Sequence, residues 1–255
     1  MALVNASSMG TRLGIVAVAM STALVVVALA VAPFLSPAWV AFEQGRTGAA
    51  ELTGFSESQL RTATDAILTD LVLGPPDFDV TVDRFQVLTE AERSHMRDVR
   101  DTFAGFFTVA AAALVVLLTA FWLAGRNGSR WTRRGAWRGV RLGALGLTIG
   151  TIAAGVIALV AFDVAFEVFH RLFFASGTYR FDPATSRLVQ LFPDAFWSET
   201  SIAVGGVILA LAAGTAWFAG RRATASAGAA VASAGGAPER LDSPGQPAGE
   251  RGPAR

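Results

Sequence analysis

Only two histidines occur in this 255-residue sequence, and each has carboxylates at helical spacing. His95 comes three residues before Asp98. His170 comes three residues after Glu167 and seven after Asp163. Residues three, four or seven apart share one face of a helix, so each imidazole is predicted to have an acid beside it. A carboxylate can fix the tautomer of a neighbouring imidazole, and two such imidazoles could serve as general acid and general base.

Other side chains near the histidines extend this candidate site. Arg100 and Arg171 could bind an anionic or carbonyl oxygen, or could instead pair with Asp163. Five phenylalanines flank His170 and serve either as membrane anchors or as walls of a substrate site: Phe162, Phe166, Phe169, Phe173 and Phe174. Two histidines with carboxylates are too unspecific to indicate a metal site, and neither a metal nor a cofactor is expected. A purely structural role for both histidines is the alternative.

Several other kinds of active site lack the residues they need. Cysteine is absent, which excludes disulfides, a thiol nucleophile and thiolate metal ligands. No glycine-rich phosphate loop and no G-x-S-x-G elbow follows a predicted strand. Acid–base catalysis by the histidines fits these absences, because it requires no nucleophile from the protein.

Both histidines stand near the ends of long apolar segments. The sequence is 53% hydrophobic and only 16% charged, which is unusual for a soluble protein. About 20 helical residues cross a hydrocarbon core, and four predicted spans meet or approach this length: 13–35, 103–124, 142–162 and 200–220. The expected fold class is an all-α membrane protein with four transmembrane helices and a small outer-face ectodomain of helix and short strands. No charge lies in the middle of a span, which argues against a transporter.

The arginines indicate how the spans are oriented. Six arginines and no acid lie in the loop between the second and third spans, and there is no lysine in the chain. The positive-inside rule therefore places this loop and both termini in the cytoplasm of a multi-pass plasma-membrane protein. The remaining segments are a cytoplasmic lead (1–12), an outer segment (36–102), the arginine-rich loop (125–141), an outer loop with a histidine motif (163–199) and a cytoplasmic tail (221–255).

The cytoplasmic segments have compositional signals of their own. Trp131 and Trp137 among the arginines are typical of a segment at an anionic inner leaflet, and nucleic acid is not an expected partner. The tail 221–255 is rich in Ala, Gly, Pro and Ser without aromatics, so it is predicted to be disordered. The first span could instead be a cleaved signal peptide, but its apolar length exceeds the usual 7–15 residues or so and favours an uncleaved anchor.

The outer segment 36–102 contains predicted elements of its own. Ser56 and Gln59 form a capping-box pattern before an amphipathic helix. That helix either lies on the bilayer or covers an ectodomain core. Its acidic character favours the core, because it offers anionic lipid nothing to attract. Alternating apolar residues over 78–82 then predict a short strand or extended segment.

A second capping box predicts the helix on which His95 lies. Thr89 and Glu92 should start a helix that runs through His95 into the second span without a breaker. His95 is eight residues before that span begins, and His170 is eight residues after the third span ends. If both helices continue straight, each imidazole lies about 12 Å beyond its span. The two should therefore meet at the outer face, near the lipid headgroups.

Two motifs around the histidines resemble those of a known family. The segment 89–100, TEAERSHMRDVR, resembles the histidine motif before the second span of the bacterial four-span membrane proteins that include lipoprotein intramolecular transacylase. The second motif combines FHRLFF (169–174), YRFDP (179–183), LFP (191–193) and the pair 196–197. With the four-span layout, the resemblance covers most of the chain up to the tail.

This resemblance implies a membrane-embedded acyltransferase and a substrate. The sn-2 acyl chain of a diacylglyceryl lipoprotein would move to the α-amino group of its own N-terminal cysteine, at the outer face of the membrane. The partners would be the lipid bilayer and the diacylated lipoprotein. The paired histidines of the family map onto His95 and His170, with six supporting residues: Asp98, Arg100, Asp163, Glu167, Arg171 and Tyr179. Tyr179 stands where many members have tryptophan, and Ser186 where aspartate is expected.

A non-enzymatic role is the alternative interpretation. An envelope membrane protein could use its acidic ectodomain to bind a partner, and His95 and His170 would then be structural. Partner binding that survives both histidine substitutions, but not changes within 50–88, would favour this alternative.

Overall fold

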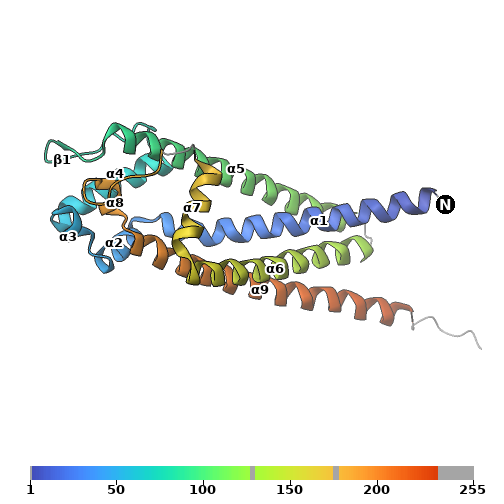
Figure 1. Ribbon diagram of the computed structural model, residues 1–255. Helices are drawn as coiled ribbons and strands as arrows, with labels where there is room; N and C mark the ends of the chain where they lie inside the picture. The colour runs from blue at the N-terminus through green and yellow to red at the C-terminus, as the bar shows by residue number, and fades with distance from the viewer. Residues whose placement is uncertain (1, 127–129, 175–177, 235–255) are drawn as a thin grey trace, which may run out of the picture.

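The computed structural model describes residues 2–126, 130–174 and 178–234, except for the side chains of 2–9, 130–132 and 225–234. In chain order its elements are α1 (Ala2–Val31), η1 (Ala32–Leu35), α2 (Pro37–Arg46), α3 (Ala49–Thr53), α4 (Glu57–Val72), β1 (Thr81–Val82), β2 (Phe85–Gln86), α5 (Glu90–Arg126), α6 (Arg130–Val160), α7 (Phe162–Phe173), α8 (Arg187–Leu191) and α9 (Asp194–Ala234). Four long helices run together, and the shorter elements gather at one end of them (Figure 1). We call this the outer end, and the opposite end, where α5 stops and α6 begins, the inner end.

The four long helices have the character of membrane spans. Within the described residues, four helices are long and apolar enough to cross a membrane: Gly10–Leu35, Glu90–Arg126, Arg133–Val160 and Asp194–Thr224. Large apolar side chains on them point outward, such as Leu118 at 62% exposure and Ile149 at 70%. Lipid hydrocarbon accepts such a surface, and helices satisfy their own backbone hydrogen bonds within it. The expected all-α fold with four spans is confirmed.

Glycines on α6 allow its close contact with α1. A Cβ atom at Gly139 would lie 2.9 Å from the carbonyl oxygen of Ile15, and one at Gly143 would overlap the carbonyl oxygen of Ala19. Because only glycine fits at such distances, the two backbones can approach as in small-xxx-small helix pairs. This contact joins the first and third spans over their inner halves.

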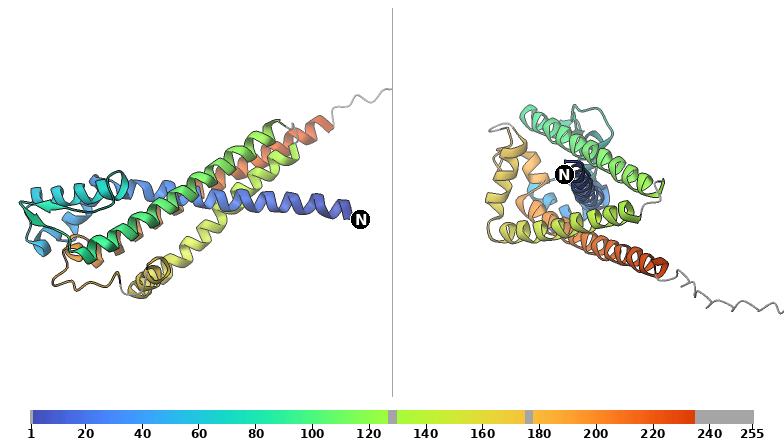
Figure 2. Two further views of the ribbon diagram at one scale, coloured as in Figure 1. Left: turned by 90° about the horizontal axis from the view of Figure 1, so that it is seen from above. Right: turned by 90° about the vertical axis from the view of Figure 1, so that its right-hand side faces the viewer.

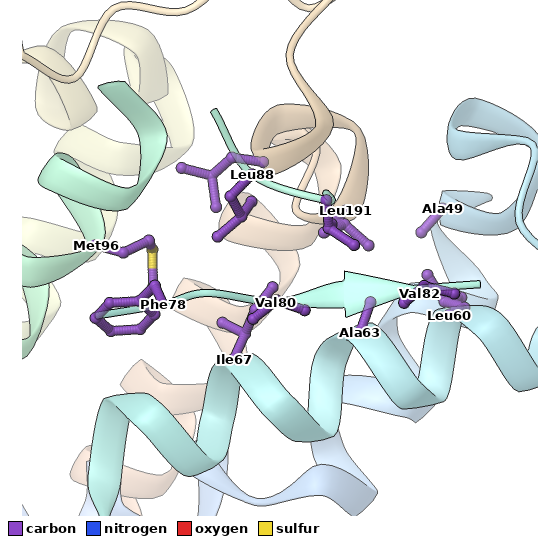
Figure 3. Close-up of a cluster of buried hydrophobic side chains, with 12 residues drawn as sticks. Ala49, Leu60, Ala63, Ile67, Phe78, Val80, Val82, Leu88, Met96 and Leu191 are labelled. Atoms are coloured by element: carbon purple, nitrogen blue, oxygen red, sulfur yellow. The ribbon is translucent and has the colours of Figure 1, made fainter. Parts of the chain in front are cut away.

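The outer-end domain has a hydrophobic core of its own (Figure 3). Its helix α4 starts with the predicted capping box, in which the Ser56 N–H donates to Gln59 Oε1 at 2.8 Å and the Gln59 N–H donates to Ser56 Oγ at 3.3 Å. Leu60 and Ile67 of α4 are almost fully buried in this core. The core also contains Met96 of α5, so the first turns of the second span belong to the domain. The helix therefore covers the core and does not lie on the bilayer, as predicted.

The segment after α4 forms a hairpin instead of a single strand. Val80 and Val82 are buried as the alternation predicted, but β1 is only two residues long and pairs antiparallel with β2. The turn between the strands contains Asp83 and Arg84 with φ of 49° and 71°. Two successive residues with positive φ match the right-handed twist of a tight hairpin. Phe78 is also in this region, with φ of 50°, and its ring is fully buried beside Met96 (Figure 3).

The third span does not continue straight toward His170, contrary to the prediction. Its helix α6 ends at Val160, and Ala161 has φ −147° and ψ 56°, which are not helical. A new helix, α7, then crosses the end of the bundle almost perpendicular to the long helices (Figures 1 and 2). One face of α7 is apolar and exposed, and the other carries His170, so lying across the bundle places each face in a different environment.

The inner end differs from the expected boundaries. Helix α6 starts at Arg130, so much of the predicted loop 125–141 is helical. Trp137 packs between Phe121 and Phe218, at ring-centroid distances of 4.7 and 5.6 Å, instead of lying on the leaflet surface. The side chain of Trp131 lies outside the described residues. Helix α9 continues to Ala234, beyond the predicted start of the tail, and residues 235–255 are outside the described range, so their disorder stays a prediction.

Candidate active site

The two histidines meet at the outer end of the bundle. His95 of α5 and His170 of α7 have ring centroids 6.1 Å apart, with 26° between the ring planes. Their side chains are nearly inaccessible, at 7% and 8% exposure. The shared position predicted from the sequence is therefore correct, although α7 reaches it by crossing the bundle and not by extending the third span.

Hydrogen bonds at the start of α5 hold the helix turn that precedes His95. The Thr89 N–H donates to Glu92 Oε2 at 2.7 Å, which forms the predicted capping box. The buried Glu92 carboxylate also accepts from Ser186 Oγ at 2.5 Å and from the Leu188 N–H at 3.0 Å. One carboxylate thus joins α5 to the beginning of α8. The sequence indicated only the capping role of Glu92, because the partners on α8 are more than 90 residues away.

A main-chain contact defines the tautomer of His170. Its Nδ1 lies 2.8 Å from the carbonyl oxygen of Phe166. A carbonyl can only accept, so Nδ1 carries the hydrogen and Nε2 of the neutral ring keeps a lone pair. Burial lowers the pKa of His170 below its ordinary 6.5 and outweighs the opposing effects of the Phe166 carbonyl and the charge of Glu167. His170 is therefore set up to act as a base through Nε2.

Aromatic rings enclose both imidazoles. Four rings surround His170 at centroid distances of 4.0 to 5.4 Å: Phe166, Phe169, Phe174 and Tyr179. His95 lies against Phe174 at 5.0 Å and Phe181 at 5.8 Å. Within the part of the chain that the structure describes, His95 Nδ1 is buried and has no hydrogen-bond partner. A buried polar atom without a partner is costly in an apolar site, so this nitrogen is suited to a reacting group.

Glu167 contacts arginines and a tyrosine rather than an imidazole. Its Oε1 accepts from Arg171 Nε at 2.8 Å, from Arg180, and from the Tyr179 hydroxyl at 3.2 Å. The hydrogen bonds from Arg171 and then Arg180 lower the pKa of Glu167 to about 2. Glu167 is thus a permanent carboxylate that holds the Tyr179 ring against His170. Arg180 was not singled out from the sequence, although it follows Tyr179 in the second motif.

Three further supporting residues were predicted from the sequence: Asp98, Asp163 and Arg100. Asp98 is half-buried, and its charge acts on His95 through space. Asp163 is exposed, and among the described contacts none links it to a histidine. The positive charge of Arg100 acts on Asp70 of α4 through space, and among the described residues Arg100 Nη1 is buried without a hydrogen-bond partner. Over the described ranges, no group of three or more His, Cys, Asp or Glu side chains is placed to hold a metal ion.

These features define an integral membrane protein with four spans, an outer-end domain and a buried histidine pair between them. The family model for lipoprotein intramolecular transacylase Lit matches residues 15–197, and the chain belongs to this family. No curated protein matches the sequence.

Solved structures of Lit from Bacillus cereus have the same fold. One, determined in meso, is 20% identical, with a TM-score of 0.72, and the match covers 87% of this chain and 99% of that one. Two further structures of that protein, in which a histidine is replaced by arginine or by alanine, are 18% identical with TM-scores of 0.69. Each of these matches covers 91% of this chain and 100% of the other.

Proposed function

We propose that this protein transfers the sn-2 acyl chain of a diacylglyceryl lipoprotein to the α-amino group of the lipoprotein's N-terminal cysteine, with His95 and His170 as an acid–base pair. The observation that carries the proposal is the burial of two imidazoles from different helices with ring centroids 6.1 Å apart. Membership of the transacylase family supports the reaction class. We place the protein in the plasma membrane with its outer end outside and both termini in the cytoplasm, on the basis of the arginine distribution.

Two proton transfers are needed for this reaction. The amine must lose a proton as its nitrogen forms a bond to the acyl carbon, and the glycerol oxygen must gain one as its bond to that carbon breaks. We assign the base to Nε2 of His170, because Nδ1 donates to the Phe166 carbonyl. His95 would protonate the glycerol oxygen, and the proton taken up by His170 would then pass to His95, so that both imidazoles regain their starting states. The products are an amide and a free glycerol hydroxyl, and no covalent bond to the protein is required.

The exposed face of α7 supports a lipid substrate. Val164, Leu172 and Phe173 on this face are all more than half exposed, and no charge interrupts them. Phe169 contacts the His170 ring at 5.4 Å and is itself 48% exposed. An acyl chain in the outer leaflet would therefore reach the imidazole over apolar side chains. Because donor and acceptor belong to one molecule, holding them close would supply much of the rate acceleration.

A partner-binding role for the ectodomain has less support. The apolar face of α4 is used in the domain's own core, with Leu60 and Ile67 buried there. The two histidines are buried, so they do not form part of an exposed binding surface. We therefore keep the transacylase as the single proposed function.

Substitution of the two histidines tests the proposal. His95→Ala and His170→Ala should each lower formation of the lyso-form lipoprotein by about 10²-fold or more, because general acid–base catalysis contributes that much. Mass spectrometry of a reporter lipoprotein, in a host lacking the normal N-acylation step, measures the yield. Leu73→Ala, at an exposed residue directly after α4, is the control and should keep activity. An unchanged yield in both histidine variants, at equal membrane abundance, would refute the assignment.

A further inference from the structure

The inner end of the bundle contains a cavity, widely open to the surroundings, that the proposed reaction does not use. It lies between α6 and α9 and has a volume of about 330 Å³. Six residues line it: Arg141, Ala216, Trp217, Gly220, Arg221 and Thr224. We propose that this cavity binds the phosphate headgroup of an anionic phospholipid, with phosphatidylglycerol as the occupant.

At the inner end, the helices that line the cavity provide positive charges but no carboxylate to neutralise them. No Asp or Glu occurs in the sequence stretches 1–42, 102–162 and 200–238, which include the helices of the inner end. Arg141 and Arg221 therefore share the cavity without a carboxylate from these segments. Two guanidinium groups at one cavity match a phosphate, which accepts several hydrogen bonds from such donors.

Aromatic side chains place the cavity at the level of a membrane interface. At this end three arginines stack on the aromatic ring four residues earlier in the same helix, with 4.7 to 5.0 Å from guanidinium carbon to ring centroid: Arg126 on Trp122, Arg221 on Trp217 and Arg222 on Phe218. Tryptophan rings and arginines gather where hydrocarbon meets headgroups. Basic pockets between spans at this level are suited to anionic headgroups.

The shape of the cavity depends on a glycine. A Cβ atom at Gly220 would lie 3.6 Å from Arg141 Nε, so any larger side chain there would fill the space beside the guanidinium. The Thr224 hydroxyl donates to the Arg221 carbonyl at 3.0 Å, which leaves its oxygen as an acceptor. A headgroup that carries both a phosphate and free hydroxyls, as in phosphatidylglycerol, satisfies the arginines and this oxygen together.

Apolar surface next to the cavity favours a lipid over a free anion. Leu142 and Leu145 follow Arg141 on α6 and are both exposed, and Trp217 beside the cavity is 63% exposed. Acyl chains attached to a headgroup in the cavity would lie over these side chains. A free phosphate would leave them uncovered.

Native mass spectrometry of the full chain in detergent tests this site, with phosphatidylglycerol and phosphatidylcholine as probes. The double variant Arg141→Gln with Arg221→Gln should weaken phosphatidylglycerol binding by about tenfold or more, because each arginine near an anionic headgroup contributes roughly fivefold. The matched control is Arg133→Gln with Arg134→Gln, which removes two exposed charges from the same end outside the cavity and should keep binding. Gly220→Leu keeps every charge but fills the cavity, so it should also lose the lipid.

Each alternative occupant has a distinct result. Equal losses in the cavity variant and the control variant would mean diffuse charge attraction and would overturn the site. Displacement of the lipid by millimolar inorganic phosphate would assign the cavity to a free anion. Binding that appears only after residues 235–255 are deleted would assign it to the chain's own C-terminal segment. If the double variant does not fold, Gly220→Leu decides, and unaltered binding in it refutes the proposal.

Discussion

The two ends of this molecule use polar side chains in opposite ways. At the outer end they are buried and bonded to each other: Glu92 accepts hydrogen bonds from Thr89 and from α8, and Gln44 connects Thr64 to the Leu191 carbonyl, both at 3.0 Å. At the inner end the helices contain arginines but no acids, and these arginines stack on aromatic rings at the surface.

This contrast shows which part of the fold depends on hydrogen bonds between side chains within the protein. The polar groups around Glu92 and Gln44 are satisfied within the protein, so removing one of them leaves another unpaired in a low-dielectric interior. Charges at the inner end are satisfied by the surroundings, so the loss of one costs little stability. Substitutions should therefore have different consequences at the two ends.

The largest expected effect is at Glu92. Glu92→Ala leaves the Ser186 hydroxyl and the Leu188 N–H without their acceptor. We expect a loss of about 3 kcal/mol in the free energy of unfolding, together with lower lyso-form yield as the turn before His95 loosens. Thermal unfolding in detergent, followed by tryptophan fluorescence, measures the stability. Glu90→Ala on the same helix is the control, since its carboxylate is exposed, and an equal Tm for both variants would contradict the contrast.

The second-largest effect is expected at Gly143, where α6 contacts α1 in the inner half of the bundle. Gly143→Ala should cost about 1–3 kcal/mol, because the new methyl group overlaps the backbone of α1. Gly146→Ala, one turn further along α6, meets no atom within 4 Å and should not lower stability, since alanine is the better helix former. The same unfolding assay compares them. Equal Tm values would show that the α1–α6 contact contributes nothing.

A smaller effect concerns the titration of His170. Burial lowers the pKa of this imidazole below 6.5, so the ring should be neutral at pH 7. Phe169→Ser would admit water to the ring, reduce the desolvation that disfavours the charged form, and raise the pKa toward 6.5. Leu172→Ser, on the exposed face of α7, should leave the pKa unchanged. NMR of labelled histidine follows the titration, and a pKa of 6.5 or higher for His170 in the unsubstituted protein would contradict the expected effect of burial.

The smallest effect is expected at Asp163. Although its spacing from His170 suggested a role, it is exposed and has no described contact with either histidine. Asp163→Asn should therefore change lyso-form yield by less than about twofold. Glu167→Gln is the comparison, because it weakens the pairs with Arg171 and Arg180 and should lower the yield more. A large loss at Asp163 would mean that the exposed acid acts on the substrate directly.

Local patterns predicted much of the fold. The apolar runs gave the four spans, and the capping boxes at Ser56 and Thr89 gave the starts of α4 and α5, because each box depends on residues only three apart. The continuity of α5 followed from the absence of a breaker between Thr89 and the second span. The meeting of His95 and His170 was also predicted from their positions relative to the spans.

The features that the sequence did not predict depend on distant contacts. The break at Ala161 contains neither Gly nor Pro, so no local signal marked it. The bonds from Ser186 to Glu92 and from Arg180 to Glu167 join residues on different elements.

The break at Ala161 has a consequence for how the two histidines are aimed. On α5 the helix is continuous, so inserting one residue between the second span and His95 would rotate the imidazole by about 100° about the axis. Between α6 and α7 the helix axis changes direction at Ala161, so the direction of His170 also depends on the dihedral angles of this residue. The position of His170 therefore depends on the backbone of Ala161 as well as on the length of the third span, whereas that of His95 depends on the register of α5 alone.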